Sequence, residues 1–372
     1  MRLRPTRGSC APSALHAGSI RLCFSGVFKA IKEALSLKTS RRTPLELLLQ
    51  CAVYSPAPPY FAEIDMQNPP RILKPLDDNA TLLDLISQVT RDPRPTAARR
   101  LLEEELCLGG TVKKDFHAHG LTPHVWNDRL VEFYAQTNAF LYQNVVWNRA
   151  PLKCDLRAWI INYLRQTDVR PRKILCFGDG LGFDSAALAC AGHDVVFFEP
   201  SQPCVEFAQS VFNANGVQVR IERSPAGISG ERFDTVVCLD VLEHVPEPSA
   251  LVKTFADWLH PDGLLITHSP FFLVYPNYET HLRSNQKYSG DWSLYRRNGL
   301  HPIAGRFFSE PIVLRKTESP PPVPLLLNVG AWLLTIGRWG WLRWPHCVAA
   351  RWMSRRDPHW ARELQRDLAP AN

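Results

Sequence analysis

Three closely spaced glycines follow a short apolar run, and an acidic residue ends a second apolar run further along. The segment KILCFGDGLG places Gly178, Gly180 and Gly182 after the first run, and VVFFEPS places Glu199 at the end of the second. Glycine at a tight strand-to-helix turn leaves room for a ligand beside the backbone. A carboxylate can accept both hydrogen bonds of a ribose diol. The pattern therefore predicts a nucleoside-binding site.

The spacing of these glycines separates two classes of nucleoside ligand. Dinucleotide-binding folds carry GxGxxG, which leaves a helix N-terminus open to a pyrophosphate. This chain has GxGxG, with Asp179 and Asp184 beside it. We expect the two carboxylates to repel phosphate. A ligand with a ribose and a cationic end fits better, and S-adenosylmethionine combines a ribose with a sulfonium and an ammonium.

The elements that position these residues can be read from the pattern of apolar runs. Between residues 173 and 315 the runs KILCF, VVFFE, VQVRI, FDTVVCL, GLLITHS, RFF and PIVLR are separated by amphipathic segments. Strands that alternate with helices predict a parallel sheet covered by helices on both faces. The last two runs, joined by Ser309, Glu310 and Pro311, predict an antiparallel hairpin. Residues 79–165 have helical spacing instead.

Four segments of the sheet region together resemble the class I S-adenosylmethionine-dependent methyltransferases. ILCFGDGLG resembles the glycine motif and VVFFEPS the ribose-binding strand end. FDTVVCLDVLEHVPEP resembles the fourth-strand motif of ubiquinone-type O-methyltransferases, and LHPDGLLI the turn into the fifth strand. The resemblance implies a Rossmann-like, doubly wound α/β fold. Its sheet is mostly parallel, with seven strands and an antiparallel last strand, between a helical N-terminal section and a helical C-terminal extension.

The same resemblance implies a set of cofactor contacts. The family has an acid two residues before the first glycine, where this chain has Cys176, so we expect Asp179 to take part of that role. Near the adenine the family has an acid, and here that place holds Glu222, Arg223 or Ser224, depending on the register of the third strand; we take Ser224. We expect Asp240 to contact the methionine part of the cofactor or a helix amide. The predicted cofactor-binding residues are Gly178, Asp179, Gly180, Gly182, Glu199, Ser224 and Asp240.

Three histidines follow strand ends on the side where the methyl acceptor would bind. A base is needed when the acceptor must lose a proton, and histidine is the usual base near neutral pH. His244 lies in DVLEHVPEP and His281 in NYETHLRSNQKYSGDW, and both are predicted to be catalytic. His244 has a second interpretation, in which it packs against the following turn. His268, in LLITHSP, could line the acceptor pocket.

The distribution of charge and of cysteine along the chain bears on nucleic-acid binding, on metal binding and on the cellular compartment. The formal net charge of +7 comes from residues 1–42, which hold nine Lys or Arg against the single acid Glu33. A nucleic-acid-binding protein usually concentrates such charge on a folded face, so we expect no nucleic-acid partner. The ten cysteines show no metal-ligand spacing, so we predict no metal and a reducing, cytoplasmic setting. Residues 1–42 also have the composition of a mitochondrial transit peptide, and the alternative is that translation starts at Met66.

The C-terminal extension combines tryptophan with arginine. Residues 319–360 hold six of the eleven tryptophans, and the uncharged apolar run after Pro324 is only thirteen residues long. That is too short to span a bilayer, which needs about twenty residues. Two interpretations remain open for residues 325–352: contact with a membrane surface, or packing on the domain or on a partner subunit. The oligomeric state is not predicted.

We expect four parts: a basic, disordered extension (1–65), a helical section (66–165), a methyltransferase domain (166–318) and the Trp/Arg-rich extension (319–372). The predicted function is methyl transfer from S-adenosylmethionine to oxygen of a small or medium-sized metabolite, or of a lipid-linked acceptor. Two alternatives are kept. One is a non-catalytic, partner-binding relative, and the other is aminopropyl transfer on the same fold.

Overall fold

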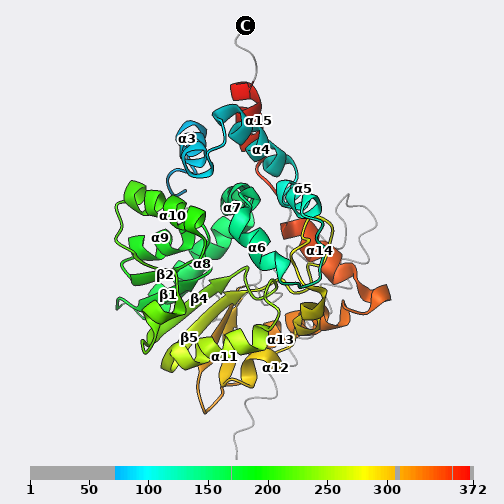
Figure 1. Cartoon of the computed structure of the whole chain (residues 1–372). Coiled ribbons are helices and arrows are strands. Elements are labelled where there is room, and N and C mark those ends of the chain that lie inside the picture. The colour runs from blue at the N-terminus through cyan, green and yellow to red at the C-terminus, as the bar shows by residue number, and fades with distance from the viewer. Residues whose placement is uncertain (1–71, 169, 306–310, 354, 369–372) are drawn as a thin grey trace, which may run out of the picture. The chain divides into compact units, whose positions relative to one another are not determined.

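A seven-stranded sheet lies at the centre of the computed structural model (Figure 1). Its strands, in sheet order, are β3 (Arg220–Glu222), β2 (Asp194–Phe198), β1 (Lys173–Phe177), β4 (Phe233–Leu239), β5 (Leu259–His268), β7 (Ile312–Lys316) and β6 (Leu300–Gly305). Strands β1 to β5 pair in parallel, and β7 is antiparallel to both β5 and β6. The predicted α/β fold with an antiparallel last strand is confirmed.

The structure describes residues 72–168, 170–305, 311–353 and 355–368, all within one unit that runs from Pro59 to the C-terminus. The predicted basic extension and the RFF run lie outside the described residues. The sixth strand is LHPIAG, from Leu300 to Gly305, which the apolar-run pattern did not identify. Pro302 and Gly305 disfavour a strand by propensity. Here pairing with β7 overrides them, with a register shift between Pro302 and Ala304.

Both faces of the sheet are covered by helices, as parallel strands require. On one face Ile174 and Cys176 pack with Trp159 and Leu164 of α8 (Pro151–Thr167). Helices α9 (Phe183–Cys190) and α10 (Gln202–Asn215) lie on that side too. On the other face Leu175 packs with residues of α11 (Pro248–Trp258) and α12 (Ser293–Arg296). The central strands are therefore buried on both sides, and their C-terminal ends remain for a site.

A group of helices lies beyond the C-terminal ends of the strands. It comprises α3 (Asn79–Thr90), α4 (Arg94–Leu106), α5 (Gly110–Ala118), α6 (Arg129–Gln136) and α7 (Ala139–Arg149). The Asp78 carboxylate caps α3 by accepting from the amides of Ala80 and Thr81. This group lies within the predicted helical section (66–165), whose range also takes in most of α8.

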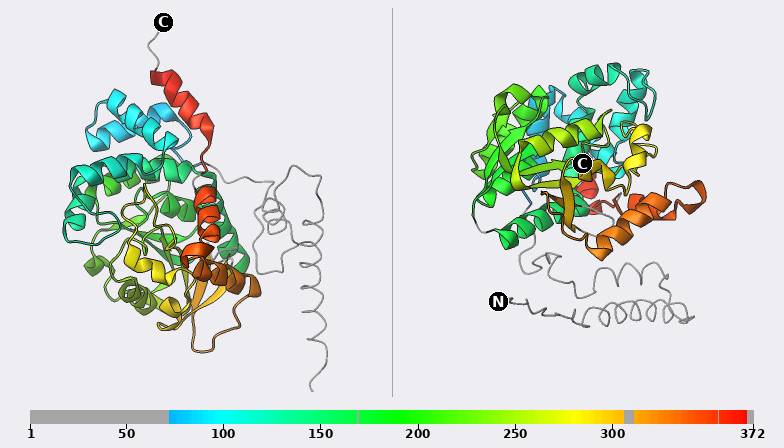
Figure 2. Two further views of the ribbon diagram at one scale, coloured as in Figure 1. Left: turned by 90° about the vertical axis from the view of Figure 1, so that its right-hand side faces the viewer. Right: turned by 90° about the horizontal axis from the view of Figure 1, so that it is seen from below.

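The C-terminal helices are α13 (Leu325–Ile336), α14 (Trp344–Met353) and α15 (Pro358–Leu368). Helix α15 packs against α4 rather than lying apart, as Figure 2 shows (α15 in red, α4 in cyan). The guanidinium of Arg149 lies 4.0 Å from the centre of the Trp360 ring and pairs with the buried Glu105. The end of the chain thus completes the helical section. Among the described helices, none has the length and apolarity to cross a bilayer.

Candidate functional site

A cavity of about 570 Å³ opens at the C-terminal ends of β1, β2 and β4, beneath α6 and α7. This volume suits a cofactor together with a small acceptor. Residues that follow the strands line one end of it: Gly178, Asp179, Gly180, Glu199, Ser201 and Asp240. Five of the seven predicted cofactor contacts are therefore brought together.

The glycines of the turn after β1 have two different structural roles: two of them line the cavity, and one allows two helices to pack closely. Gly178 and Gly180 line the cavity with φ of 71° and 63°, in the left-handed region that favours glycine. A Cβ on Gly178 would lie 2.7 Å from Val241 Cγ2. Gly182 is not among the lining residues. A Cβ there would lie 2.7 Å from the Cβ of Ala208, so this glycine permits the close packing of α9 on α10.

The Glu199 carboxylate accepts hydrogen bonds from two backbone amides and keeps further acceptor positions for a ligand. Its Oε2 accepts the Gly180 amide at 3.2 Å and its Oε1 accepts the Ser201 amide at 3.0 Å. An ionised carboxylate has about four acceptor positions, so each oxygen can still accept another hydrogen bond. Burial raises the pKa of Glu199 to about 7, against which the two amides act. A ligand that donates two hydroxyls would favour the ionised form.

The Asp179 carboxylate occupies the N-terminus of α9. It accepts from the amides of Asp184 at 3.2 Å and Ser185 at 2.7 Å, in the first turn of α9. Those amides are the ones that a pyrophosphate would use in a dinucleotide-binding fold. Burial, together with the charge of Asp184, raises the pKa of Asp179 to about 7.

The expectation that Asp184 repels anions is wrong. Its carboxylate is buried between Lys153 Nζ at 2.9 Å and Arg157 Nε at 2.9 Å, both from α8. Burial opposes ionisation of Asp184, but the two cations outweigh it and lower the pKa. Asp184 is thus part of a neutralised buried cluster, and its charge does not select the ligand.

Asp240 connects this cluster to the end of β5. It has a φ of 59°, an uncommon conformation for a residue other than glycine. Its carboxylate accepts from His268 Nδ1 at 2.5 Å, Trp147 Nε1 at 2.8 Å and Lys153 Nζ at 3.3 Å. Burial acts to raise its pKa, but the charges of His268 and Lys153 outweigh this and hold the pKa well below its usual range. His268 lies fully buried behind Asp240 and is not among the lining residues.

The other end of the cavity is apolar and aromatic. Its lining side chains come from the helical section, the segment after β5 and helix α14: Trp126, Val131, Tyr134, Phe140, Tyr278 and Met353. Tyr134 and Phe140 stack with their ring centres 5.0 Å apart. The sequence motifs gave no signal for this wall, because its residues come from elements far apart in the chain.

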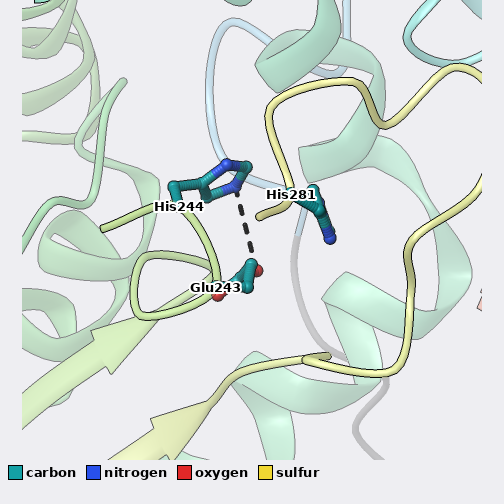
Figure 3. A group of neighbouring side chains, drawn as sticks. All are labelled: Glu243, His244 and His281. Carbon is teal, nitrogen blue, oxygen red and sulfur yellow. Dashed lines mark ion pairs between the residues drawn. The ribbon is translucent and has the colours of Figure 1, made fainter. Parts of the chain in front are cut away.

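Glu243, His244 and His281 meet where the polar and apolar ends join (Figure 3). The ring centres of the two histidines lie 4.6 Å apart, edge to face, and His244 Nε2 lies 3.9 Å from Glu243 Oε1. Burial lowers the pKa of His244 to about 4 and that of His281 well below its usual value. Both rings are therefore neutral near pH 7.

The segment after β5 fixes this group in place. The Asn285 side-chain amide donates to the carbonyls of Leu242, Glu243 and Val245 at 2.8 to 3.3 Å. One donor atom from each of Glu243, His244 and His281 lies within 4.8 Å of the others. Two imidazoles and a carboxylate could also hold a divalent cation. Sequence spacing gave no sign of this set, because His281 comes from a distant segment.

Ser224 is not brought to the cavity. Its hydroxyl caps the short 3-10 helix η1 (Pro225–Ile228) by accepting from the Ala226 amide at 3.3 Å, and its side chain is exposed. Three cavity residues that sequence analysis missed are Trp147, Lys153 and Glu243.

Comparison with known proteins places this site in a family. Residues 149–310 match the family model described as a methyltransferase domain. The ubiquinone biosynthesis O-methyltransferase of Actinobacillus pleuropneumoniae serotype 5b is 32% identical over 102 residues, which cover 25% of this chain and 44% of that protein. The enzyme of the same name from Azorhizobium caulinodans is 35% identical over 104 residues, covering 26% and 41%.

Among solved structures, Burkholderia thailandensis 1,6-didemethyltoxoflavin-N1-methyltransferase has a TM-score of 0.38 at 19% identity, covering 52% of this chain and 92% of that one. The chain spans less than half the length of the two curated relatives described above. Within residues 149–310, which match the family model, the glycine turn, the Glu199 strand end and the DVLEHV segment are all present. Residues 149–310 therefore belong to the class I S-adenosylmethionine-dependent methyltransferase family.

Proposed function

We propose that this protein transfers a methyl group from S-adenosylmethionine to an oxygen atom of a small or medium-sized, largely apolar acceptor. The observation that carries the proposal is that one cavity joins two complementary ends. Glu199 with free acceptor positions lies at the polar end, and His244 lies at the border of the apolar, aromatic end. The similarity to ubiquinone biosynthesis O-methyltransferases, together with the resemblance of the DVLEHV segment, supports oxygen as the acceptor atom.

The residues present fit the cofactor. Glu199 would accept the ribose hydroxyls, and Gly178 and Gly180 leave the space for the nucleoside beside the backbone. Asp179 keeps the helix N-terminus closed to phosphate. Bound S-adenosylmethionine supplies an electrophilic methyl group on its sulfonium. The protein then has to align the acceptor and exclude water, which can supply about 7 to 11 kcal/mol of the barrier.

His244 is proposed to accept the acceptor's proton at Nε2. Its Nδ1 lies 3.2 Å from the Thr280 carbonyl oxygen, which can only accept, so Nδ1 carries the proton and Nε2 has the lone pair. Glu243 Oε1, 3.9 Å from Nε2, would stabilise the imidazolium that forms. His281 packs edge-on against His244 and positions its ring.

The two alternatives from the sequence are not favoured. Aminopropyl transfer needs several carboxylates to bind a polyamine. Among the described residues, Glu243 is the one acid that lines the cavity beyond its polar end, at the border of the apolar end. Two acids of the polar end, Asp184 and Asp240, are already paired with cations. A non-catalytic relative would not need an open acceptor end, and here that end is open and carries an oriented histidine.

We expect S-adenosylmethionine to bind roughly tenfold more tightly at pH 8 than at pH 6. The pKa of Glu199 is raised by burial to about 7, so at pH 6 only about a tenth of the free protein carries the carboxylate that accepts the ribose hydroxyls. As the pH rises through 7 this fraction approaches one, so the dissociation constant falls and then levels off. Calorimetric titration across this range measures the effect.

Glu199→Gln is the matched variant for this titration. Because the amino group of the cofactor itself titrates near pH 8, the informative quantity is the difference in pH dependence between the two proteins. The variant should bind weakly at every pH and lose the Glu199 contribution. Equal pH dependence in both proteins would contradict the placement of the ribose at Glu199.

Turnover tests the reaction itself. The protein is incubated with cell extract and methyl-labelled S-adenosylmethionine, and labelled products are sought by mass spectrometry. We expect a labelled apolar product with a new methyl ether or ester, and no change after dialysis against a chelator, because the proposed proton acceptor is an imidazole. Cofactor binding without product in any extract would favour the non-catalytic alternative. Loss of product with the chelator, restored by a divalent cation, would assign the Glu243, His244 and His281 group to metal binding instead.

A further inference from the structure

Helix α13 is apolar on both of its faces. One face is buried on the domain through Leu327, Ala331 and Leu334. Its two polar side chains also contact the domain: the exposed Asn328 accepts from Trp292 Nε1 at 3.2 Å, and the Thr335 hydroxyl donates to the Ser289 carbonyl at 3.4 Å. The helix is therefore held in a fixed orientation.

The outward face of α13 is apolar except for Asn328, and it carries no charged side chain. Leu325, Leu326, Val329 and Trp332 lie on it, and the Trp332 side chain is 59% exposed. A helix on the surface of a soluble domain normally turns charged or polar residues outward. Contiguous exposed apolar surface of this kind marks an interaction site.

The turn that follows α13 extends this apolar face with aromatic rings. Trp339 is 65% exposed and Trp341, in the 3-10 turn η4 (Gly340–Leu342), is 82% exposed. Trp344 begins α14 and is exposed as well. In Figure 1 and in the right-hand view of Figure 2, this turn lies at the outer edge of the described chain, away from the sheet. Nothing in the described part of the chain covers these rings.

The charge around the rings has one sign. Arg343 and Arg351 are exposed on the same segment, and Arg338 lies between Trp332 and Trp339. Residues 325–353 contain no Asp or Glu, although the chain as a whole has 36. The segment thus has exposed tryptophans and arginines, with no acidic residue in the same segment to balance the arginines. A complementary partner has an anionic surface above an apolar interior.

We propose that residues 325–351, here called the docking face, bind the surface of an anionic lipid bilayer. Tryptophan rings favour the depth of the lipid headgroups, and arginines pair with anionic headgroups while the apolar side chains enter the acyl boundary. The helix is fixed on the domain and has only twelve residues, so it lies on a bilayer and does not cross it. This inference does not depend on the proposed reaction.

The test is co-sedimentation of the full chain with lipid vesicles. One set of vesicles is phosphatidylcholine, and the other contains roughly a quarter phosphatidylglycerol. We expect at least about tenfold stronger binding to the anionic vesicles, since each arginine near the surface contributes on the order of a few-fold. Binding should weaken in about 0.5 M salt, where the screening length is a few ångströms.

Two sets of variants distinguish binding through the docking face from non-specific adsorption to the vesicles. Replacing Trp332, Trp339 and Trp341 by Ser should reduce binding to anionic vesicles at least about tenfold, whereas Leu106→Ser with Leu368→Ser, which removes exposed apolar side chains elsewhere, should not. Arg343→Glu with Arg351→Glu should abolish the preference for anionic lipid. Arg99→Glu with Arg362→Glu makes the same change in charge on exposed positions of α4 and α15 and should leave it intact.

The proposal is overturned by either of two results. One is an absence of vesicle binding for the unaltered protein at low salt. The other is a concentration-dependent dimer in sedimentation velocity that the tryptophan substitutions dissociate, because the docking face would then be covered by a second copy. Calorimetric titration with S-adenosylmethionine checks that each variant is folded. If the unaltered protein itself does not bind S-adenosylmethionine, the cofactor assignment is wrong and the lipid proposal is unaffected. The unfolding transition measured by circular dichroism then serves as the check of folding.

Discussion

Gly180→Val is expected to weaken S-adenosylmethionine binding at least about 100-fold while the domain stays folded, a loss of roughly 2.7 kcal/mol of binding free energy. Gly180 lines the polar end of the cavity, and its amide donates to Glu199 Oε2. A Cβ at this position would already lie 3.0 Å from the Asn144 side-chain nitrogen. The two γ-carbons of valine would extend further into the space between the turn and α7, where the nucleoside is placed.

The matched control for this variant is Gly192→Val. Gly192 also has a left-handed φ, of 92°, but a Cβ there meets no atom within 4 Å, and the residue does not line the cavity. Both variants therefore pay a similar backbone strain of roughly 1 to 2 kcal/mol. Only Gly180→Val should lose the cofactor. Calorimetric titration gives the dissociation constants and thermal unfolding by circular dichroism gives the strain. A Gly180→Val protein that binds like the control would remove the cofactor from this turn.

The polar end of the cavity could be predicted because its signals are local. A glycine turn must follow directly on the strand that carries it, and Glu199 ends a strand, so spacing in the sequence is enough to place both. Ser224 was predicted only by counting residues along the third strand, and the structure places it outside the cavity. The reason is that β3 is only three residues long and the chain then turns into η1. Asp184 does lie beside the glycine turn, as the sequence indicates, but the sequence does not show that cationic side chains neutralise it.

Those partners come from elements whose position depends on tertiary packing. Lys153 and Arg157 lie on α8, before the first strand, and Trp147 lies on α7, where no motif marks them. Likewise, His281 and Glu243 meet because Asn285 holds the distant segment against the turn after β4. Helix α15 could not be assigned to the helical section either, because its contact with α4 joins the two ends of the described chain.

The acceptor end of the cavity lies largely outside the segment that the family shares. The family match begins at residue 149, while Trp126, Val131, Tyr134 and Phe140 precede it and Met353 follows it. The shared segment accounts for the cofactor end and for His244. The apolar end of the cavity is therefore built mainly by segments outside the family match, and that match does not identify what binds there.

The buried cations of α8 are the second place where a single substitution should have a large effect. Lys153→Met is expected to lower the free energy of unfolding by about 3 to 5 kcal/mol, the usual cost of breaking a buried ion pair. Lys153 Nζ lies 2.9 Å from Asp184 Oδ2 and 3.3 Å from Asp240 Oδ2, and its side chain is 5% exposed. Burial disfavours its charge, but the two carboxylates outweigh this and raise its pKa. Methionine fills a similar volume and leaves both carboxylates short of a cation.

The exposed pair on α11 gives the control for that substitution. Lys253 Nζ lies 2.5 Å from Asp257 Oδ2, which is closer than either contact of Lys153, but its side chain is 66% exposed. Lys253→Met should therefore cost less than about 1 kcal/mol, because water and salt screen the interaction. Urea denaturation of both variants measures the difference. Equal and small losses would mean that water reaches Lys153. In that case the polar end of the cavity would be hydrated around Asp240 and Asp184, and the low pKa of both carboxylates would need another cause.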